Sequence, residues 1–244
     1  MKNIQIIPAI LPRDFDELKA KLILLKEAYL LLGMDDKLMV QIDVCGSILD
    51  IKHGDLKENL EEIGKIIENL GIEIDFINKC YTAKEEWIGI GVKRAIIHFD
   101  NIDQDEKEIE GKGKIAGFNK EDFESFIKHY LNRGIKIGLG IRMDNSLKQI
   151  QSYLEKVDFV QFMGIDKVGL QGSQFNPQVI ENIKEFRKEY PEMIISVDGG
   201  VNLENAKDLI EAGANRLVVG SAIFGEKNSA QEIAENYKKF NNIN

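Results

Sequence analysis

The 244-residue sequence is acidic, with 41 Asp and Glu residues against 32 Lys and Arg residues and a formal net charge of −9. This charge argues against a general surface for nucleic acids or anionic membranes. Two cysteines are too few for a disulfide framework, and neither a signal-peptide pattern nor an apolar run of spanning length is visible. We therefore expect a cytoplasmic protein that binds neither nucleic acid nor membrane.

Apolar runs rich in Val and Ile alternate with amphipathic segments along the whole chain. The runs predict strands at 4–9, 38–44, 72–77, 93–99, 135–141, 158–163, 193–198 and 215–219. The amphipathic segments predict helices at 14–32, 57–69, 83–90, 120–133, 145–156, 176–189, 203–212 and 229–240. Eight strand–helix units of this length predict one α/β domain over residues 1–244, a (β/α)₈ TIM barrel. An open doubly wound sheet is the alternative.

Smaller signals punctuate this pattern. Asp14, Asn145 and Asn202 are expected to cap the N-termini of the first, fifth and seventh helices. The charged, Gly-containing stretch 101–122 follows the fourth strand and predicts a loop insertion. Long loops of this kind are either solvated connections or lids over a site.

Acidic side chains fall at the ends of three predicted strands. In MVQIDV, Val40, Ile42 and Val44 share one face, which leaves Gln41 and Asp43 on the other. By the same alternation Asp75 and Asp198 face the interior of a barrel near the strand ends, and His98 ends the fourth strand. Active sites of such barrels lie at the C-terminal ends of the strands. Because three unpaired carboxylates would repel one another, we expect a cation, a shared proton, or both.

Glycine-rich turns follow the last two strands, in VDGGV (197–201) and VVGSAIFG (218–225). Glycine lets backbone N–H groups approach an anion closely, and a helix N-terminus adds positive partial charge. Loops after strands 7 and 8 frequently hold phosphate in barrel enzymes. The turns therefore favour a phosphate site over simple tight turns.

Four segments, spread along nearly the whole length of the chain, resemble the ribulose-phosphate 3-epimerase family. They are IIPAILPRDFDEL (6–18), VQIDVCGS (40–47), the stretch 157–188 and ISVDGGVNLENAKDLIEAGANRLVVGSAIFG (195–225). The resemblance implies a (β/α)₈ enzyme that converts D-ribulose 5-phosphate into D-xylulose 5-phosphate and is a homo-oligomer. One carboxylate removes the C3 proton, a second returns a proton to the opposite face, and a divalent metal stabilises the enediolate.

The resemblance also implies roles for particular residues. Asp43 and Asp198 carry the two acid/base roles, and Met163 is retained in the sixth strand. The sugar phosphate would contact backbone around Gly172, Gly199, Gly200, Gly220 and Ser221.

The metal site departs from the family's two-His, two-Asp pattern. Gln41 occupies the first His position, and Asp75 occupies the second if strand parity sets the alignment; a shift of two residues would put Ile77 there. Gln41, Asp43, Asp75 and Asp198 could still form an all-oxygen site, which suits Mg²⁺ or Mn²⁺ better than Zn²⁺. The alternative is a protein that binds no metal.

Without a metal the enediolate needs another stabiliser. His98 and Arg142, both near strand ends, are the candidates. A hydrogen-bonded core histidine and an ion pair between loops are the corresponding structural interpretations of these two residues. On the function, an aldolase, decarboxylase or isomerase of another sugar phosphate, or a non-catalytic phosphosugar-binding protein, are the alternatives to an epimerase.

Overall fold

A computed structural model of the chain describes most of the sequence. The described residues are 4–34, 38–44, 53–68, 70–77, 84–102, 107–109, 113–115, 120–166, 173–226 and 229–243. The statements below concern these residues.

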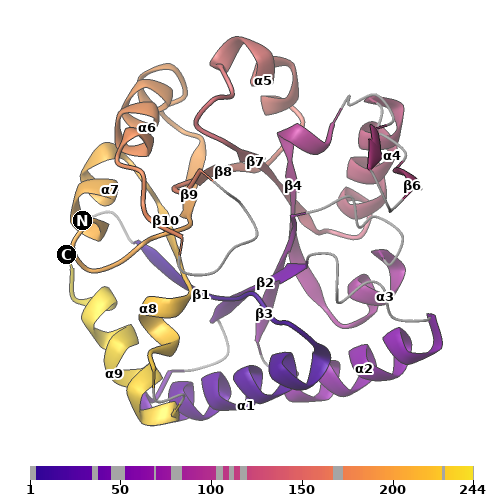
Figure 1. The fold of residues 1–244 in the computed structure, drawn as a ribbon, viewed down its shortest axis with the longest axis vertical. Coiled ribbons are helices and arrows are strands. Elements are labelled where there is room, and N and C mark those ends of the chain that lie inside the picture. The colour runs from indigo at the N-terminus through magenta and orange to yellow at the C-terminus, as the bar shows by residue number, and fades with distance from the viewer. Residues whose placement is uncertain are drawn as a thin grey trace.

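Parallel strands close into a barrel, in the order β1-β10-β9-β8-β7-β4-β3-β2 (Figure 1). The strands are β1 (Gln5–Ile10), β2 (Met39–Val44), β3 (Gly71–Phe76), β4 (Val92–His98), β7 (Lys136–Ile141), β8 (Phe159–Met163), β9 (Ile194–Asp198) and β10 (Arg216–Val219). Each lies within two residues of the predicted run. The (β/α)₈ barrel is therefore confirmed, and the open sheet is excluded because β1 pairs with both β2 and β10.

Helices surround the barrel and cover the outer faces of its strands (Figure 1). They are α1 (Phe15–Leu31), α2 (His53–Ile66), α3 (Lys84–Gly89), α4 (Lys120–Leu131), α5 (Leu147–Leu154), α6 (Gln178–Glu189), α7 (Ala206–Ala212), α8 (Ser221–Phe224) and α9 (Ala230–Asn241). The short α8, in the turn after β10, was not among the predicted helices. None of the helices in the described part of the chain is long and apolar enough to cross a membrane.

Strand alternation separates the outer core from the barrel interior. Val40, Ile42 and Val44 of β2 are fully buried among the residues of the main hydrophobic cluster, as predicted. The intervening side chains enter the barrel, whose small apolar cluster is formed by Ile7, Ala9, Met39 and Val218. The rest of the interior contains buried polar and charged side chains, whereas bulky branched residues usually fill such barrels.

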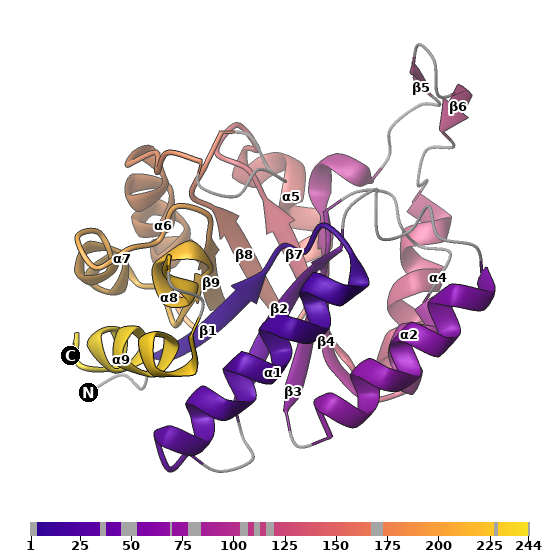
Figure 2. The same ribbon diagram turned by 60° about the horizontal axis from the view of Figure 1, so that its bottom comes forward.

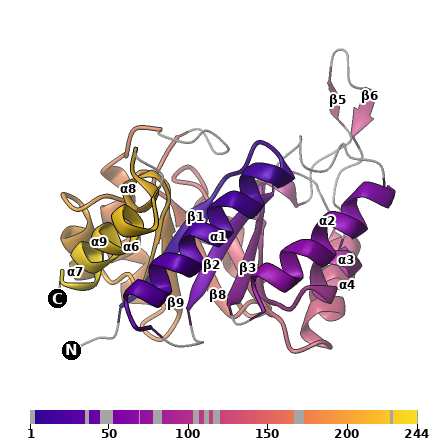
Figure 3. The same cartoon turned by 90° about the horizontal axis from the view of Figure 1, so that it is seen from below.

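The insertion at 101–122 contains regular structure that the sequence analysis did not predict. A 3₁₀ turn, η3 (Phe99–Asn101), follows β4, and β5 (Lys107–Ile109) pairs antiparallel with β6 (Gly113–Ile115). This two-stranded sheet projects away from the barrel, as Figures 2 and 3 show. The predicted loop insertion thus carries a short hairpin, which pairs its backbone groups locally.

Two of the three predicted helix caps are wrong. Asp14 caps α1 as expected, and its carboxylate accepts a hydrogen bond from the Glu17 N–H at 2.8 Å. The N-cap of α5 is Ser146 instead of Asn145, and that of α7 is Asn205 instead of Asn202. Both asparagines instead accept backbone N–H groups in the turns before the helices, a common competing use of the Asn side chain.

Candidate active site

Three carboxylates meet inside the barrel at the C-terminal ends of β2, β3 and β9. Asp43, Asp75 and Asp198 each offer an oxygen atom, and these atoms lie within 4.8 Å of one another. Asp75 is fully buried, and Asp43 and Asp198 expose only 8% and 9% of their surface. The spatial gathering that strand parity predicted is therefore present.

Two glutamine amides connect these acids. Gln41 Nε2 donates to Asp43 Oδ1 at 2.7 Å and to Asp198 Oδ2 at 2.8 Å. Gln161 Nε2 donates to Asp75 Oδ2 at 2.9 Å and to Asp198 Oδ2 at 3.3 Å. The amides thus join β2, β3, β8 and β9 into one hydrogen-bonded cluster.

Gln161 is a site residue that the sequence analysis missed. It lies two positions before Met163 on the predicted strand 158–163 and therefore shares its inward face. A fully buried amide inside an apolar strand is the same signal that identified Gln41. Applied to every strand, that signal would have found it.

His98 is hydrogen-bonded to one of the acids. Its Nε2 lies 2.8 Å from Asp75 Oδ1, and both side chains are buried. Gly140 makes room for the imidazole, because a Cβ atom there would lie 3.0 Å from His98 Nδ1. Burial disfavours the charged ring, but the Asp75 carboxylate, with Asp198 and Asp100, outweighs it and raises the pKa of His98. The site thus includes a group able to carry positive charge beside Asp75.

Burial and mutual repulsion make two of the acids hard to ionise. Burial raises the pKa of Asp43 well above its ordinary value, and the negative charges of Asp198 and Asp75 add to the effect. Burial and the charge of Asp75 raise the pKa of Asp198 to about 7, although Gln41 and His98 oppose the shift. Near neutral pH the pair can therefore contain one protonated and one ionised carboxyl group, as an acid–base pair requires.

The raised pKa of Asp198 predicts a pH-dependent stability for the metal-free protein. The folded state holds this proton up to about pH 7, against an ordinary value of 3.8. The contribution of Asp198 to stability is therefore fully present below about pH 4 and is lost as pH rises to 7. A pKa shift of this size corresponds to a contribution on the order of 4 kcal/mol to the free energy of unfolding. Urea denaturation at pH 5 and pH 8 in EDTA should show a smaller difference for Asp198→Asn than for the wild type. Asp144→Asn, which alters an exposed side chain, is the control and should show the same change in stability between pH 5 and pH 8 as the wild type. If Asp198→Asn also showed the same change as the wild type, the pH dependence would not come from Asp198.

A second charged layer lies deeper in the barrel. Arg94 donates to Glu73 Oε2 at 3.3 Å and to Gln5 Oε1 at 3.2 Å, and the Arg216 guanidinium lies 4.6 Å from the centre of the Phe159 ring. Burial raises the pKa of Glu73 although both arginines oppose the shift. Glu73 shares the parity of Asp75, so this inward carboxylate was also accessible to the sequence analysis and was missed.

The Gly-Gly turn after β9 adopts conformations that favour glycine. Gly199 and Gly200 have φ values of 98° and 67°. A Cβ atom on Gly200 would lie 2.8 Å from Phe175 Cα, so the turn also packs closely against a neighbouring segment. Gly164, which follows β8, donates its N–H to the carbonyl of Asp198 at 2.6 Å. The turn is therefore fixed directly beside the acidic cluster.

The remaining candidate phosphate contacts lie on neighbouring elements. Gly220 is the N-cap of α8 and Ser221 its first residue, immediately after β10. Met163 is buried at the end of β8 and pairs in register with Asp198. Gly172 lies outside the described residues.

Arg142 takes part in contacts between loops. Its Nε lies 3.3 Å from Asp100 Oδ2 and 3.7 Å from Asp144 Oδ1, and Nη2 donates to the Asp166 carbonyl at 3.2 Å. Its side chain is 40% exposed. The structure thus shows an ion pair between loops for this residue, whereas His98 contacts an acid of the cluster directly.

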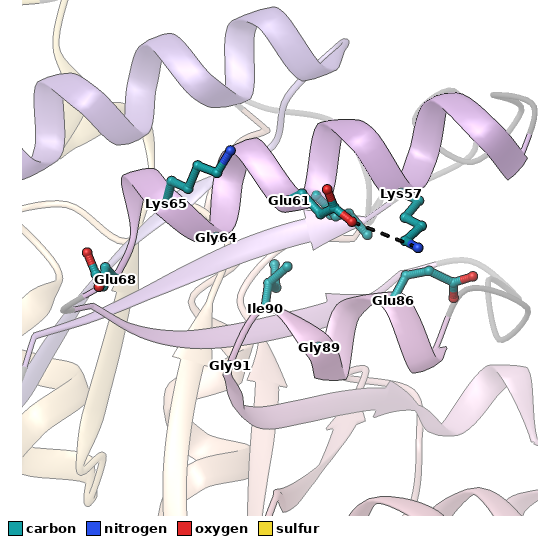
Figure 4. Close-up of a pocket in the computed structure, with 10 residues that line it drawn as sticks. Lys57, Glu61, Gly64, Lys65, Glu68, Glu86, Gly89, Ile90 and Gly91 are labelled. Atoms are coloured by element: carbon teal, nitrogen blue, oxygen red, sulfur yellow. Dashed lines mark ion pairs between the residues drawn. The ribbon is translucent and has the colours of Figure 1, made fainter.

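A large cavity lies on the outside of the barrel, between α2 and α3 (Figure 4). Its volume is about 1010 Å³, and its lining includes Lys57, Glu61 and Ile90. Lys57 and Glu61 form an ion pair along α2. None of the clustered acids lines this cavity, so it is separate from the candidate active site.

The acidic cluster fits a divalent cation by the chemistry of its donors. Three carboxylates supply oxygen atoms close enough to share one ion, and hard cations such as Mg²⁺ and Ca²⁺ prefer such ligands. The side-chain oxygen of Gln41 is buried without a hydrogen-bond partner among the described residues. This oxygen is thus a further, uncharged ligand atom for a cation, on the same amide group that contacts Asp43 and Asp198 through its nitrogen.

Curated relatives resemble part of the chain. The aligned segment is 29% identical over 114 residues to ribulose-phosphate 3-epimerase of Schizosaccharomyces pombe, covering 47% of this chain and 50% of the relative. It is 35% identical over 108 residues to the Bacillus subtilis protein of the same name, covering 42% and 49%. The chain thus spans about half the length of these relatives.

Solved structures share the fold at low identity. A 3-hexulose-6-phosphate synthase from Salmonella typhimurium superposes with a TM-score of 0.66 at 13% identity, covering 98% of both chains. KGPDC from Streptococcus mutans superposes with a TM-score of 0.67 at 13% identity, again covering 98% of both chains. At this identity the likeness shows the barrel fold alone.

The sequence model described as "Ribulose-phosphate 3 epimerase family" matches residues 64–224, which is more than half of the chain. This segment includes β3, β8, β9 and β10, and with them Asp75, Gln161 and Asp198. The chain therefore belongs to the ribulose-phosphate 3-epimerase family.

Proposed function

We propose that this chain, folded as one barrel domain over residues 1–244, is a 3-epimerase of a ketose phosphate. The substrate pair is D-ribulose 5-phosphate and D-xylulose 5-phosphate. The observation that carries the proposal is the pair Asp43 and Asp198, which stand on β2 and β9 and are joined through the Gln41 amide. Family membership and the names of the curated relatives support the same reaction.

The two carboxyl groups exchange roles during the reaction. In one direction ionised Asp198 removes the C3 proton, and protonated Asp43 returns a proton to the opposite face of C3. In the reverse direction Asp43 is the base and Asp198 the acid. The raised pKa values of both groups support a state in which one proton is shared between them near neutral pH. In this proposal Asp43 and Asp198 make both proton transfers, and no further acid or base is needed.

A positive partner must face the enediolate oxygens, because charge develops there as the proton leaves. A divalent ion held by Asp43, Asp75, Asp198 and the Gln41 oxygen would supply it, and the all-oxygen donors favour Mg²⁺ or Mn²⁺ over Zn²⁺. His98, beside Asp75, supplies a positive group in the metal-free alternative.

The phosphate group is assigned to the turns after β8, β9 and β10. Backbone N–H groups of Gly199, Gly200, Gly220 and Ser221 bind its oxygens, together with Gly172, while Met163 packs under the sugar. The positive φ values of Gly199 and Gly200 support this assignment, because they allow backbone to approach a ligand closely.

Solvent isotope exchange tests this proposal. In D₂O the protein is expected to introduce deuterium at C3 of ribulose 5-phosphate, measured by NMR, with and without added Mg²⁺, Mn²⁺, Fe²⁺ or Zn²⁺. Mg²⁺ or Mn²⁺ should support exchange after EDTA treatment better than Zn²⁺. Absence of exchange under all of these conditions contradicts epimerase activity.

The departures from the family's metal-site pattern favour a second candidate function. By the resemblance, Gln41 stands where the family has histidine, and so does Asp75 if strand parity sets the alignment. The same barrel could therefore perform an aldolase, decarboxylase or isomerase reaction on another sugar phosphate. NMR of the products from a panel of C3 and C4 epimeric ketose phosphates separates the two, because epimerisation preserves the carbon count and the keto position.

A further inference from the structure

Two buried amide groups bridge the acids of the cluster, in addition to the contact of His98 with Asp75. The Nε2 atom of Gln41 contacts Asp43 and Asp198, and that of Gln161 contacts Asp75 and Asp198. Each amide thus directs both of its N–H bonds to carboxylate oxygens. Asp198 Oδ2 accepts from both amides and connects the two halves.

The buried interior of the barrel strengthens these hydrogen bonds. Both glutamines are fully buried, so water does not compete for the donors. Hydrogen bonds to an ionised acceptor are roughly twice as strong as neutral ones. Three close carboxylates without donors or a cation would carry a large repulsive free energy. The amides therefore stabilise the carboxyl groups through hydrogen bonds, a role that a bound ion fills in other acidic sites.

The opposite end of each amide supports this interpretation. Gln41 Oε1 and Gln161 Oε1 are both buried and have no hydrogen-bond partner within the described part of the chain. Leaving a buried acceptor unpaired costs free energy. In both side chains the N–H groups face the acids and the oxygen stays unpaired. The reverse orientation would place the amide oxygen against carboxylate oxygens, which would repel it.

We infer that Gln41 and Gln161 are positioning residues that form an amide clamp, holding Asp43, Asp75 and Asp198 in place when no divalent ion is bound. The clamp and the ion compete for the same carboxylate oxygens. A bound ion would replace these N–H donors at the carboxylates, and the Gln41 oxygen would be free to turn toward it, whereas Gln161 would only lose its contacts. The inference rests on the proposed function only for the acid/base roles of Asp43 and Asp198.

Metal affinity distinguishes a clamp, whose N–H groups compete with the ion for carboxylate oxygens, from a side chain that only fills space. Gln161→Met keeps the length of the side chain but removes the N–H donors and adds no charge. Because Asp75 and Asp198 then lose a shared donor, Mn²⁺ should bind to the metal-stripped variant about tenfold tighter or more than to the wild type. A residue that only fills space would leave Mn²⁺ affinity unchanged or weaken it.

Calorimetric titration with Mn²⁺ measures this difference without any turnover. The matched control is Gln231→Met, which alters an exposed glutamine of α9 whose amide contacts Glu235; it should bind Mn²⁺ as the wild type does. Metal-free Gln161→Met should also melt at a lower temperature and gain more from Mn²⁺ than the wild type. Should Gln161→Met fail to fold by circular dichroism, Gln161→Leu replaces it, with the same expectation.

Unchanged or weaker Mn²⁺ binding by the folded variant overturns the clamp, and so does the absence of binding by both proteins. Tighter binding supports it. Failure of the proposed reaction is read separately, from deuterium exchange by the wild-type protein. The two results can therefore fail independently.

Discussion

Replacing Asp43 with asparagine is expected to lower kcat for C3 epimerisation by about 10²–10⁴-fold, the range typical for loss of one general acid–base group. Asparagine keeps the shape of the side chain but cannot transfer the proton. Asp198→Asn should have an effect of similar size, because each direction of the reaction uses both carboxyl groups. Initial rates with ribulose 5-phosphate measure both effects.

Stability separates lost chemistry from lost folding in these variants. Because burial and neighbouring charge oppose ionisation of Asp43, Asp43→Asn should unfold at the same or a higher urea concentration than the wild type. Asp144→Asn is the control, since that side chain is 75% exposed and contacts Arg142. Near-normal turnover by either Asp43→Asn or Asp198→Asn would contradict the two-carboxylate mechanism.

Replacing Arg94 with methionine is expected to reduce the free energy of unfolding by about 3–5 kcal/mol at pH 8, the usual cost of leaving a buried charge unpaired. The Arg94 side chain is 14% exposed and its partner Glu73 is fully buried. Methionine retains most of the apolar volume, so the loss reports mainly on charge and hydrogen bonds. Urea denaturation followed by circular dichroism measures it.

A double variant tests the cause of that loss. Adding Glu73→Gln removes the carboxylate that has lost Arg94 and should restore part of the stability that Arg94→Met loses. As the surface comparison, Lys156→Met breaks a partly exposed ion pair with Glu124 and should cost less than about 1 kcal/mol. If Arg94→Met were as stable as Lys156→Met, Arg94 would not be what compensates the charge of Glu73.

Local alternation in the sequence was sufficient to locate the strands and the three acids. In β2, apolar residues at every second position bury one face against the helices, so the residues between them must enter the barrel. The same rule applied to β3 and β9 gave Asp75 and Asp198 at the same end of the barrel. These inferences succeeded because strand geometry depends on neighbours along the chain.

The errors concern elements with little periodicity. The β5–β6 hairpin and the four-residue α8 are too short to show a pattern, and both lie in segments that resemble ordinary loops. Asn145 and Asn202 had the right residue type for caps but bonded to turn backbone nearby. Several side chains can satisfy one helix terminus, so composition alone did not choose between them.

By itself, the sequence determined the barrel, the inward position of Asp43, Asp75 and Asp198, and the acidic character of one end. Only the tertiary structure decided which side chains hydrogen-bond to the acids at that end. Gln41 contacts an acid 157 positions away, and Gln161 contacts one 86 positions earlier, because closing the barrel brings β2, β3, β8 and β9 together around one interior. A hydrogen bond requires atoms within about 3 Å in a suitable direction, and no local pattern encodes that across separate strands. Gln41 and Asp43 can therefore both be buried in the core strand β2, because Asp198 on β9 accepts a hydrogen bond from the Gln41 amide.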